Sequence, residues 1–144
     1  MPGAKKYSIL VCVHPESANG LLYSVLSGPT FYVETVQSYS ECLRRINTGK
    51  FNALVIDAFF FKKKNIVISN LIQELVTLLP VIVIAEKEDP ENESRIREHK
   101  IFYYLPKPVD QKELSEVLNQ SVRWSQTSQE YEEYRLKRGV PKKP

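Results

Sequence analysis

Val81-Ile82-Val83-Ile84 is an uninterrupted run of four aliphatic residues, and each of them is β-branched. Three similar apolar runs lie at residues 9–13, 53–56 and 101–105. Their apolarity is continuous rather than alternating, which is the pattern of strands buried on both faces of a parallel sheet. A weaker run, Phe31–Val36, alternates apolar with polar residues and predicts an edge strand.

Amphipathic segments separate these runs and predict helices. The predicted helices span residues 17–26, 40–47, 66–79, 91–99 and 110–124. Gly28-Pro29 and Gly49 are stop signals after the first two helices, and Asp89-Pro90 is a start signal for the fourth. Strands that alternate with helices in this way predict an α/β fold, a doubly wound five-stranded parallel sheet.

The composition is that of an ordinary globular chain. Of 144 residues, 42% are apolar and 26% are charged, which excludes a disordered chain, a collagen and a disulfide scaffold. Cys12 and Cys42 lack metal-ligand spacing, so we expect both to be reduced and structural. No apolar stretch reaches the roughly 18 residues of a membrane span. Residues 1–20 lack a signal-peptide pattern, so we expect a cytoplasmic protein.

The charge and composition change near residue 125. The net charge is +3, of which residues 1–124 carry +1 and residues 125–144 carry +2. We therefore predict a domain over residues 6–124 and a polar, basic C-terminal tail or linker over residues 125–144. Within this tail, Glu130–Arg138 is compatible with a continued helix, and Gly139–Pro144 is predicted to be disordered.

The residues that follow the strands are the informative ones, because chemistry in such sheets lies at the carboxyl ends of the strands. Asp57 ends one predicted strand, and Lys107 follows another. We expect the two side chains to converge at one edge. One interpretation is a partly buried salt bridge. The other is a phosphoacceptor carboxylate with a lysine that neutralises the added oxygens.

Three motifs carry a resemblance to a known family. They are Ala-Leu-Val-Ile-Asp at residues 53–57, Pro-Val-Ile-Val-Ile at residues 80–84, and Tyr-Leu-Pro-Lys-Pro at residues 104–108. Val109-Asp110 and Glu113-Leu114 follow the last motif. Over about residues 6–124 the chain resembles the receiver domain of two-component response regulators. This resemblance implies a flavodoxin-like (CheY-like) three-layer α/β/α fold.

The resemblance also implies roles for particular residues. Asp57 matches the phosphorylated aspartate of the family, and Lys107 matches its phosphoryl-site lysine. The peptide bond between Lys107 and Pro108 is expected to be cis. Tyr104 matches the aromatic switch residue.

Departures from the family pattern are equally informative. The acidic pair that binds Mg²⁺ falls on Val13 and His14, neither of which supplies a hard oxygen ligand. Glu16 is displaced from that position and would serve through a water molecule. Glu16 and Asp57 are the weak candidate ligands, and we expect no cofactor and little or no Mg²⁺ binding. The hydroxyl-bearing switch position is Ala85.

The loop after Asp57 also departs from the family. The usual Pro-Gly is replaced by Phe59-Phe60-Phe61 and by Lys62-Lys63-Lys64. Aromatic residues mixed with cations occur in single-strand binders, but three contiguous aromatics more often anchor a loop. Nucleic acid is therefore not the favoured partner. A membrane is not an expected partner either.

Two hypotheses from different classes follow. In the first, the protein is a pseudo-receiver, a non-catalytic protein-interaction module that has kept the fold and lost the phosphorylation switch. In the second, it is an atypical but working receiver that is phosphorylated on Asp57. The lost acidic pair favours the first, and the retained Asp57 and Lys107 favour the second.

The predicted partner is a signalling protein, either a sensor kinase or another regulator. The predicted docking face comprises the helix 91–99, the strand 101–105 and the last helix, with Tyr103 and Tyr104 as aromatic anchors near or on it. Ala85 leaves room beside Tyr104, so an inward position of the Tyr104 ring is left open. A homodimer and a separate output domain are left open. No glycine-rich phosphate loop and no nucleophile triad is present, so no enzymatic activity is expected. The charged run at residues 86–89 is predicted to be solvated.

Overall fold

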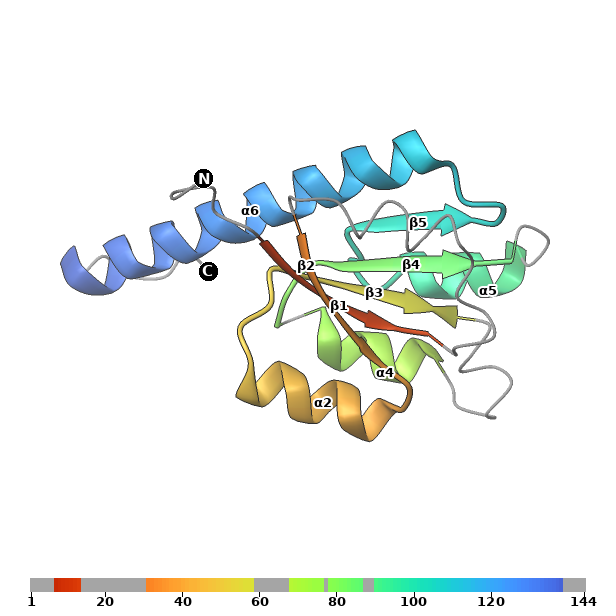
Figure 1. The fold of residues 1–144 in the computed structure, drawn as a ribbon, viewed down its shortest axis with the longest axis horizontal. Coiled ribbons are helices and arrows are strands. Elements are labelled where there is room, and N and C mark those ends of the chain that lie inside the picture. The colour runs from red at the N-terminus through yellow and green to blue at the C-terminus, as the bar shows by residue number, and fades with distance from the viewer. Residues whose placement is uncertain (1–6, 14–30, 59–67, 77, 87–89, 139–144) are drawn as a thin grey trace.

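A computed structural model of the protein describes residues 7–13, 31–58, 68–76, 78–86 and 90–138. From residue 31 onward, the strands and helices alternate as the sequence predicts (Figure 1). They are β1 (Tyr7–Cys12), β2 (Phe31–Val36), α2 (Tyr39–Thr48), β3 (Ala53–Asp57), α4 (Ile68–Leu75), β4 (Val81–Ala85), α5 (Pro90–Arg97), β5 (Tyr103–Pro106) and α6 (Gln111–Arg138).

The five strands form one parallel sheet in the order β2-β1-β3-β4-β5. This order confirms the predicted doubly wound fold, with the alternating strand β2 at an edge. All strands point the same way, so their carboxyl ends meet at one edge of the sheet (Figure 1).

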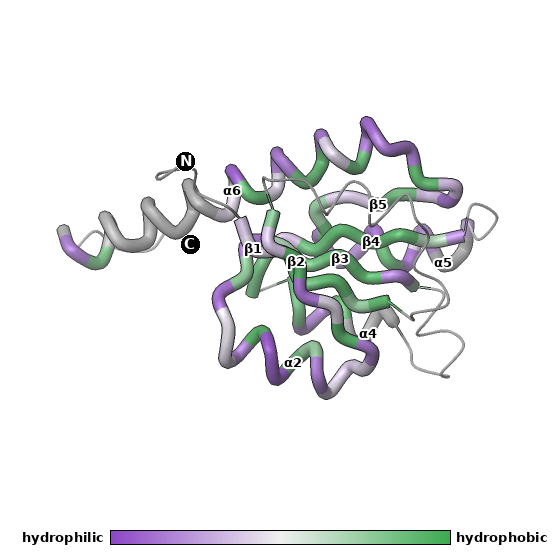
Figure 2. The backbone as a smooth tube through the Cα atoms, in the orientation of Figure 1, coloured by the Kyte–Doolittle hydropathy of each residue, from purple (hydrophilic) through white to green (hydrophobic). Residues whose placement is uncertain are grey.

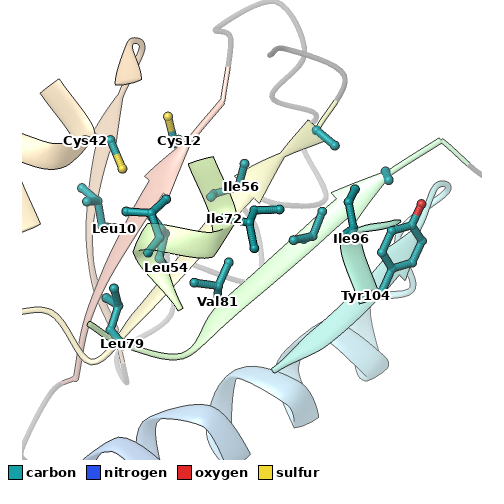
Figure 3. Packing of buried hydrophobic residues seen from close by; sticks show 14 of the residues in the cluster. Leu10, Cys12, Cys42, Leu54, Ile56, Ile72, Leu79, Val81, Ile96 and Tyr104 are labelled. Atoms are coloured by element: carbon teal, nitrogen blue, oxygen red, sulfur yellow. The ribbon is translucent and has the colours of Figure 1, made fainter. Parts of the chain in front are cut away.

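Each central strand contributes alternate side chains to two apolar clusters, one on each face of the sheet. One cluster packs against α2, α4 and α5 and includes Cys42, Ile72 and Ile96 (Figure 3). The other packs against α6 and includes Leu114 and Leu118. The hydropathy colouring shows the same arrangement, with the apolar residues concentrated in the central strands (Figure 2). Burial on both faces is the reason for the continuous apolar runs in the sequence.

The ends of α2 agree with the sequence signals. The Ser38 side chain accepts a hydrogen bond from the backbone N–H of Glu41 (3.2 Å), as an N-cap residue does. At the other end, the Gly49 N–H donates to the carbonyl of Arg45 (2.7 Å). A Cβ atom at Gly49 would lie 2.8 Å from the ring of Phe51, so only glycine fits there without a shift.

The last helix is longer than predicted. α6 spans 28 residues and continues through the predicted domain boundary between residues 124 and 125. Ser125, predicted as the first residue of the tail, is buried. Beyond it, the second half of α6 projects past the sheet (Figure 1). The expected end near Trp124 is therefore wrong, whereas the continued helix over Glu130–Arg138 that the sequence allowed is present.

Several predicted features lie outside the described residues. They are the helix 17–26 with its stop signal, His14, Glu16, the Phe59–Lys64 loop, Asp89 and the segment 139–144.

Both cysteines are buried, and neither forms a disulfide, as predicted. Within the described ranges, no helix combines the length and the apolar content that crossing a bilayer requires.

Candidate functional site

The ends of β3 and β5 bring a carboxylate and an ammonium together at the carboxyl edge of the sheet. Asp57 is the last residue of β3, and Lys107 directly follows β5. The Lys107 Nζ lies 2.9 Å from Oδ2 of Asp57. The predicted convergence of these two side chains is confirmed, although their strands are separated in the sheet by β4.

The pair is buried on one side. The Asp57 side chain is 3% exposed, whereas that of Lys107 is 21% exposed. Burial by itself lowers the pKa of Lys107, but the hydrogen bonds and charges of Asp57 and Glu86 outweigh it and raise the pKa above its ordinary value. Lys107 is therefore a cation at neutral pH and supplies the charge that compensates the buried Asp57.

Glu86 is a third member of the site, and the sequence did not predict it. Its Oε1 lies 3.2 Å from Nζ of Lys107, and its side chain is 52% exposed. We expected residues 86–89 to be a solvated run, and Glu86 is indeed exposed, but its carboxylate also pairs with Lys107. The sequence feature that could have indicated this contact is the position of Glu86 directly after β4, the strand adjacent to β5.

The backbone holds these residues in place. The N–H of Lys107 donates to the carbonyl of Ala85 at 2.8 Å, so the ends of β4 and β5 are joined. The Lys107-Pro108 peptide bond is cis, as predicted. Asp110 accepts a hydrogen bond through Oδ1 from the N–H of Glu113 (2.8 Å) and thereby caps α6 directly after this turn.

The two switch positions lie on one face of the sheet. Ala85 and Tyr104 are both buried in the cluster that faces α5 (Figure 3). The guanidinium of Arg97 lies 5.2 Å from the centre of the Tyr104 ring. Ala85 has no hydroxyl that could bond an added oxyanion, and the Tyr104 ring already lies inside the protein. Tyr104 is thus not an exposed anchor, and its ring lies inward beside Ala85, which is the other position that the sequence allowed for it.

The position of the acidic pair also lacks oxygen ligands in the described part of the chain. Val13 follows β1 and is buried. Because Cys12 pairs with Ile56, Val13 comes next to Asp57 in register. Among the described residues, no group of three or more His, Cys, Asp or Glu side chains lies together. The described carboxylates at this edge, those of Asp57 and Glu86, both contact Lys107.

Aromatic side chains are exposed around the last strand and helix. Tyr103 is 38% exposed, and its hydroxyl lies 3.1 Å from Oε2 of Glu113. The hydrogen bond and the charge of Glu113 raise the pKa of Tyr103. Trp124 is also exposed, and its ring centre lies 6.5 Å from that of Phe102. Of the two predicted anchors, Tyr103 is therefore the one at the surface.

Comparison with known proteins finds solved structures with the same fold but no protein with a closely similar sequence. No protein-family model and no curated protein matches the chain. The signal receiver domain of an HD domain-containing protein from Pseudomonas fluorescens Pf-5 matches with a TM-score of 0.75 and 19% identity, over 87% of this chain and 93% of that one. A receiver domain protein from Methanospirillum hungatei JF-1 matches with a TM-score of 0.69 and 19% identity, over 86% of this chain and 99% of that one.

A longer protein shares the fold as well. NtrX from Brucella abortus matches with a TM-score of 0.75 and 20% identity, over 95% of this chain and 31% of NtrX. The structural neighbours of the chain are thus response-regulator receiver domains, and the chain has their fold. At these identities the likeness establishes the fold alone.

Proposed function

We propose that this protein is a pseudo-receiver, a signalling module that binds a partner protein and is not switched by Mg²⁺-dependent phosphorylation. The observation that carries the proposal is the state of the carboxyl edge. The positions beside the buried Asp57 hold Val13 and Ala85, neither of which has a side-chain oxygen to bind a metal ion or a phosphoryl group. Binding a partner is its role here, rather than catalysis.

The physical argument concerns how a phosphoryl group would be received and sensed. Phosphoryl transfer depends on positioning and on cations that neutralise the developing charge. Val13 contributes no metal-ligating oxygen. Ala85 cannot bond the added group, so it offers no differential contact that would favour a second conformation. Tyr104 is already buried, which leaves no outward ring to be drawn in.

Transfer from a small phosphodonor tests the proposal directly. Incubation of the full chain with acetyl phosphate and Mg²⁺ is expected to leave its intact mass unchanged. An ordinary receiver domain treated in parallel is the positive control, and Asp57→Asn is the matched negative control. A phosphoryl group that is added to the wild type and absent from Asp57→Asn would overturn the proposal.

The second candidate function is a working phosphoacceptor receiver. The 2.9 Å contact between Asp57 and Lys107 favours it, because it is the geometry in which a lysine reaches an acceptor carboxylate. The same mass measurement separates the two functions.

The docking face that we propose for the partner comprises α5, β5 and the first half of α6. Tyr103 is exposed there, and Tyr32 is an exposed tyrosine on β2, at the opposite edge of the sheet. We expect Tyr103→Ala to weaken binding of the sensor kinase or other regulator by about 1–3 kcal/mol, the cost of truncating an aromatic hot spot. Calorimetry with wild type, Tyr103→Ala and Tyr32→Ala measures this. Equal losses for both variants would contradict the assigned face.

A further inference from the structure

Lys107 is held between two carboxylates that come from two different strands. Its Nζ lies 2.9 Å from Oδ2 of Asp57 and 3.2 Å from Oε1 of Glu86. In the parallel pairing of β4 and β5, Ala85 pairs with Pro106, so Glu86 and Lys107 are the next neighbours in register. The register of the sheet therefore brings the Glu86 carboxylate to the ammonium.

The charges at this point are not balanced. Two carboxylates share one ammonium, so the three side chains carry a net charge of −1 when all are ionised. Any further anion that approaches Lys107 would meet the repulsion of both Asp57 and Glu86. The Glu86 carboxylate also accepts a hydrogen bond from one of the three N–H donors of the lysine ammonium. That donor is then not available to a phosphate oxygen.

The two carboxylates differ in how easily they can move. Asp57 is 3% exposed at the end of a central strand, whereas Glu86 is 52% exposed. An exposed ion pair is weak and is screened by salt, so the Glu86 side chain can leave Lys107 at little cost. Asp57 is the permanent partner of Lys107, and Glu86 is the displaceable one.

We propose that the Glu86 carboxylate occupies the place beside Lys107 that an incoming oxyanion would take, so that Lys107 binds a phosphate-like anion only when Glu86 is displaced or neutralised. Lys107 is the cation that contacts the anion, and this inference goes beyond the proposed function, which assigns no anion to Lys107. Glu86 is a positioning residue in this account.

Inorganic phosphate is the probe that tests this role. The titration uses Asp57→Asn and the double variant Asp57→Asn/Glu86→Gln, at low ionic strength, and follows the backbone amide of Lys107 by NMR. We expect the double variant to bind phosphate at least about fivefold more tightly, which equals about 1 kcal/mol, the upper end for an exposed ion pair. The gain should shrink as salt is added.

Matched controls make the result specific. The control variant Asp57→Asn/Glu98→Gln removes one negative charge from an exposed glutamate that precedes β5, whereas Lys107 follows that strand. This control variant should bind phosphate as weakly as Asp57→Asn. Adding Lys107→Gln to the double variant should abolish the gain. Equal affinity in Asp57→Asn and Asp57→Asn/Glu86→Gln would overturn the role of Glu86. None of these variants has a phosphoacceptor, so this outcome is independent of the phosphodonor test.

A second measurement keeps Asp57 in place, in case its replacement prevents folding. The neutral amine is the form of lysine that reacts with an acylating reagent, and a paired carboxylate keeps it protonated. Peptide mass analysis should therefore show faster acylation of Lys107 in Glu86→Gln than in the wild type or in Glu98→Gln. Identical rates in the three proteins would show that Glu86 does not hold Lys107.

Discussion

Replacing Lys107 with methionine is expected to lower the free energy of unfolding by about 3 kcal/mol, because it leaves the buried Asp57 carboxylate without its cation. The Asp57 side chain is 3% exposed and lies 2.9 Å from the ammonium, so bulk water cannot replace the lost partner. Methionine preserves most of the aliphatic length of lysine, which limits the loss of packing. Urea unfolding at neutral pH measures the difference.

Two comparisons separate this effect from other causes. Lys112→Met removes an exposed lysine of α6 and is expected to change stability by less than about 0.5 kcal/mol. Lys107→Met/Asp57→Asn should recover most of the loss, since no buried charge then lacks a partner. A loss in Lys107→Met as small as that in Lys112→Met would mean that Asp57 does not depend on this contact.

The same ion pair predicts a dependence on pH. The pKa of Lys107 in the folded protein lies above its ordinary value. A group with a raised folded pKa contributes its full stability below its unfolded pKa and loses it as the pH rises through the folded value. The difference in stability between wild type and Lys107→Met should thus be constant near neutral pH and shrink at alkaline pH.

Restoring the lost oxygen ligands is the second change from which we expect a large effect. The variant Val13→Asp/His14→Asp/Ala85→Thr places two carboxylates after β1 and a hydroxyl at the end of β4. We expect acetyl phosphate and Mg²⁺ to phosphorylate it on Asp57 at least about 100-fold faster than the wild type, because a metal ion supplies several kcal/mol of charge stabilisation. Intact mass against time gives both rates.

Partial variants show which lost group matters. Ala85→Thr alone should remain unlabelled, since it restores no metal ligand. In the triple variant, Mg²⁺ should raise the melting temperature, because the added carboxylates repel Asp57 until a cation binds between them. A triple variant that folds and binds Mg²⁺ without gaining phosphoryl groups would contradict the view that these three positions account for the loss of the switch.

Much of the fold follows from local sequence. The apolar runs at residues 53–56 and 81–84 are continuous because helices cover both faces of the central strands. The convergence of Asp57 and Lys107 was predicted because parallel strands end at the same edge of a sheet. The missing oxygens at Val13 and Ala85 are a matter of residue type and need no structure.

Other structural features could not be predicted from local sequence patterns, because they depend on tertiary interactions. The end of α6 was placed near Trp124 with a continued helix over Glu130–Arg138 left open, whereas the structure has one unbroken helix as far as Arg138. The sequence left open whether the Tyr104 ring lies at the docking face or turns inward beside Ala85. Its burial was decided by the α5 helix that packs over that face of the sheet.

By itself, therefore, the sequence determined the strand and helix pattern, the parallel sheet, and the pairing of Asp57 with Lys107. Only the tertiary structure decided that Glu86 shares Lys107 and that, of the two predicted anchors, Tyr103 is the one at the surface. The physical reason is that the hydrophobic effect acts on each segment's own residues. The apolar pattern of a segment therefore indicates which of its faces are buried. Which polar side chains meet depends on strand register and on helices far away in the sequence, and a local pattern carries no record of either.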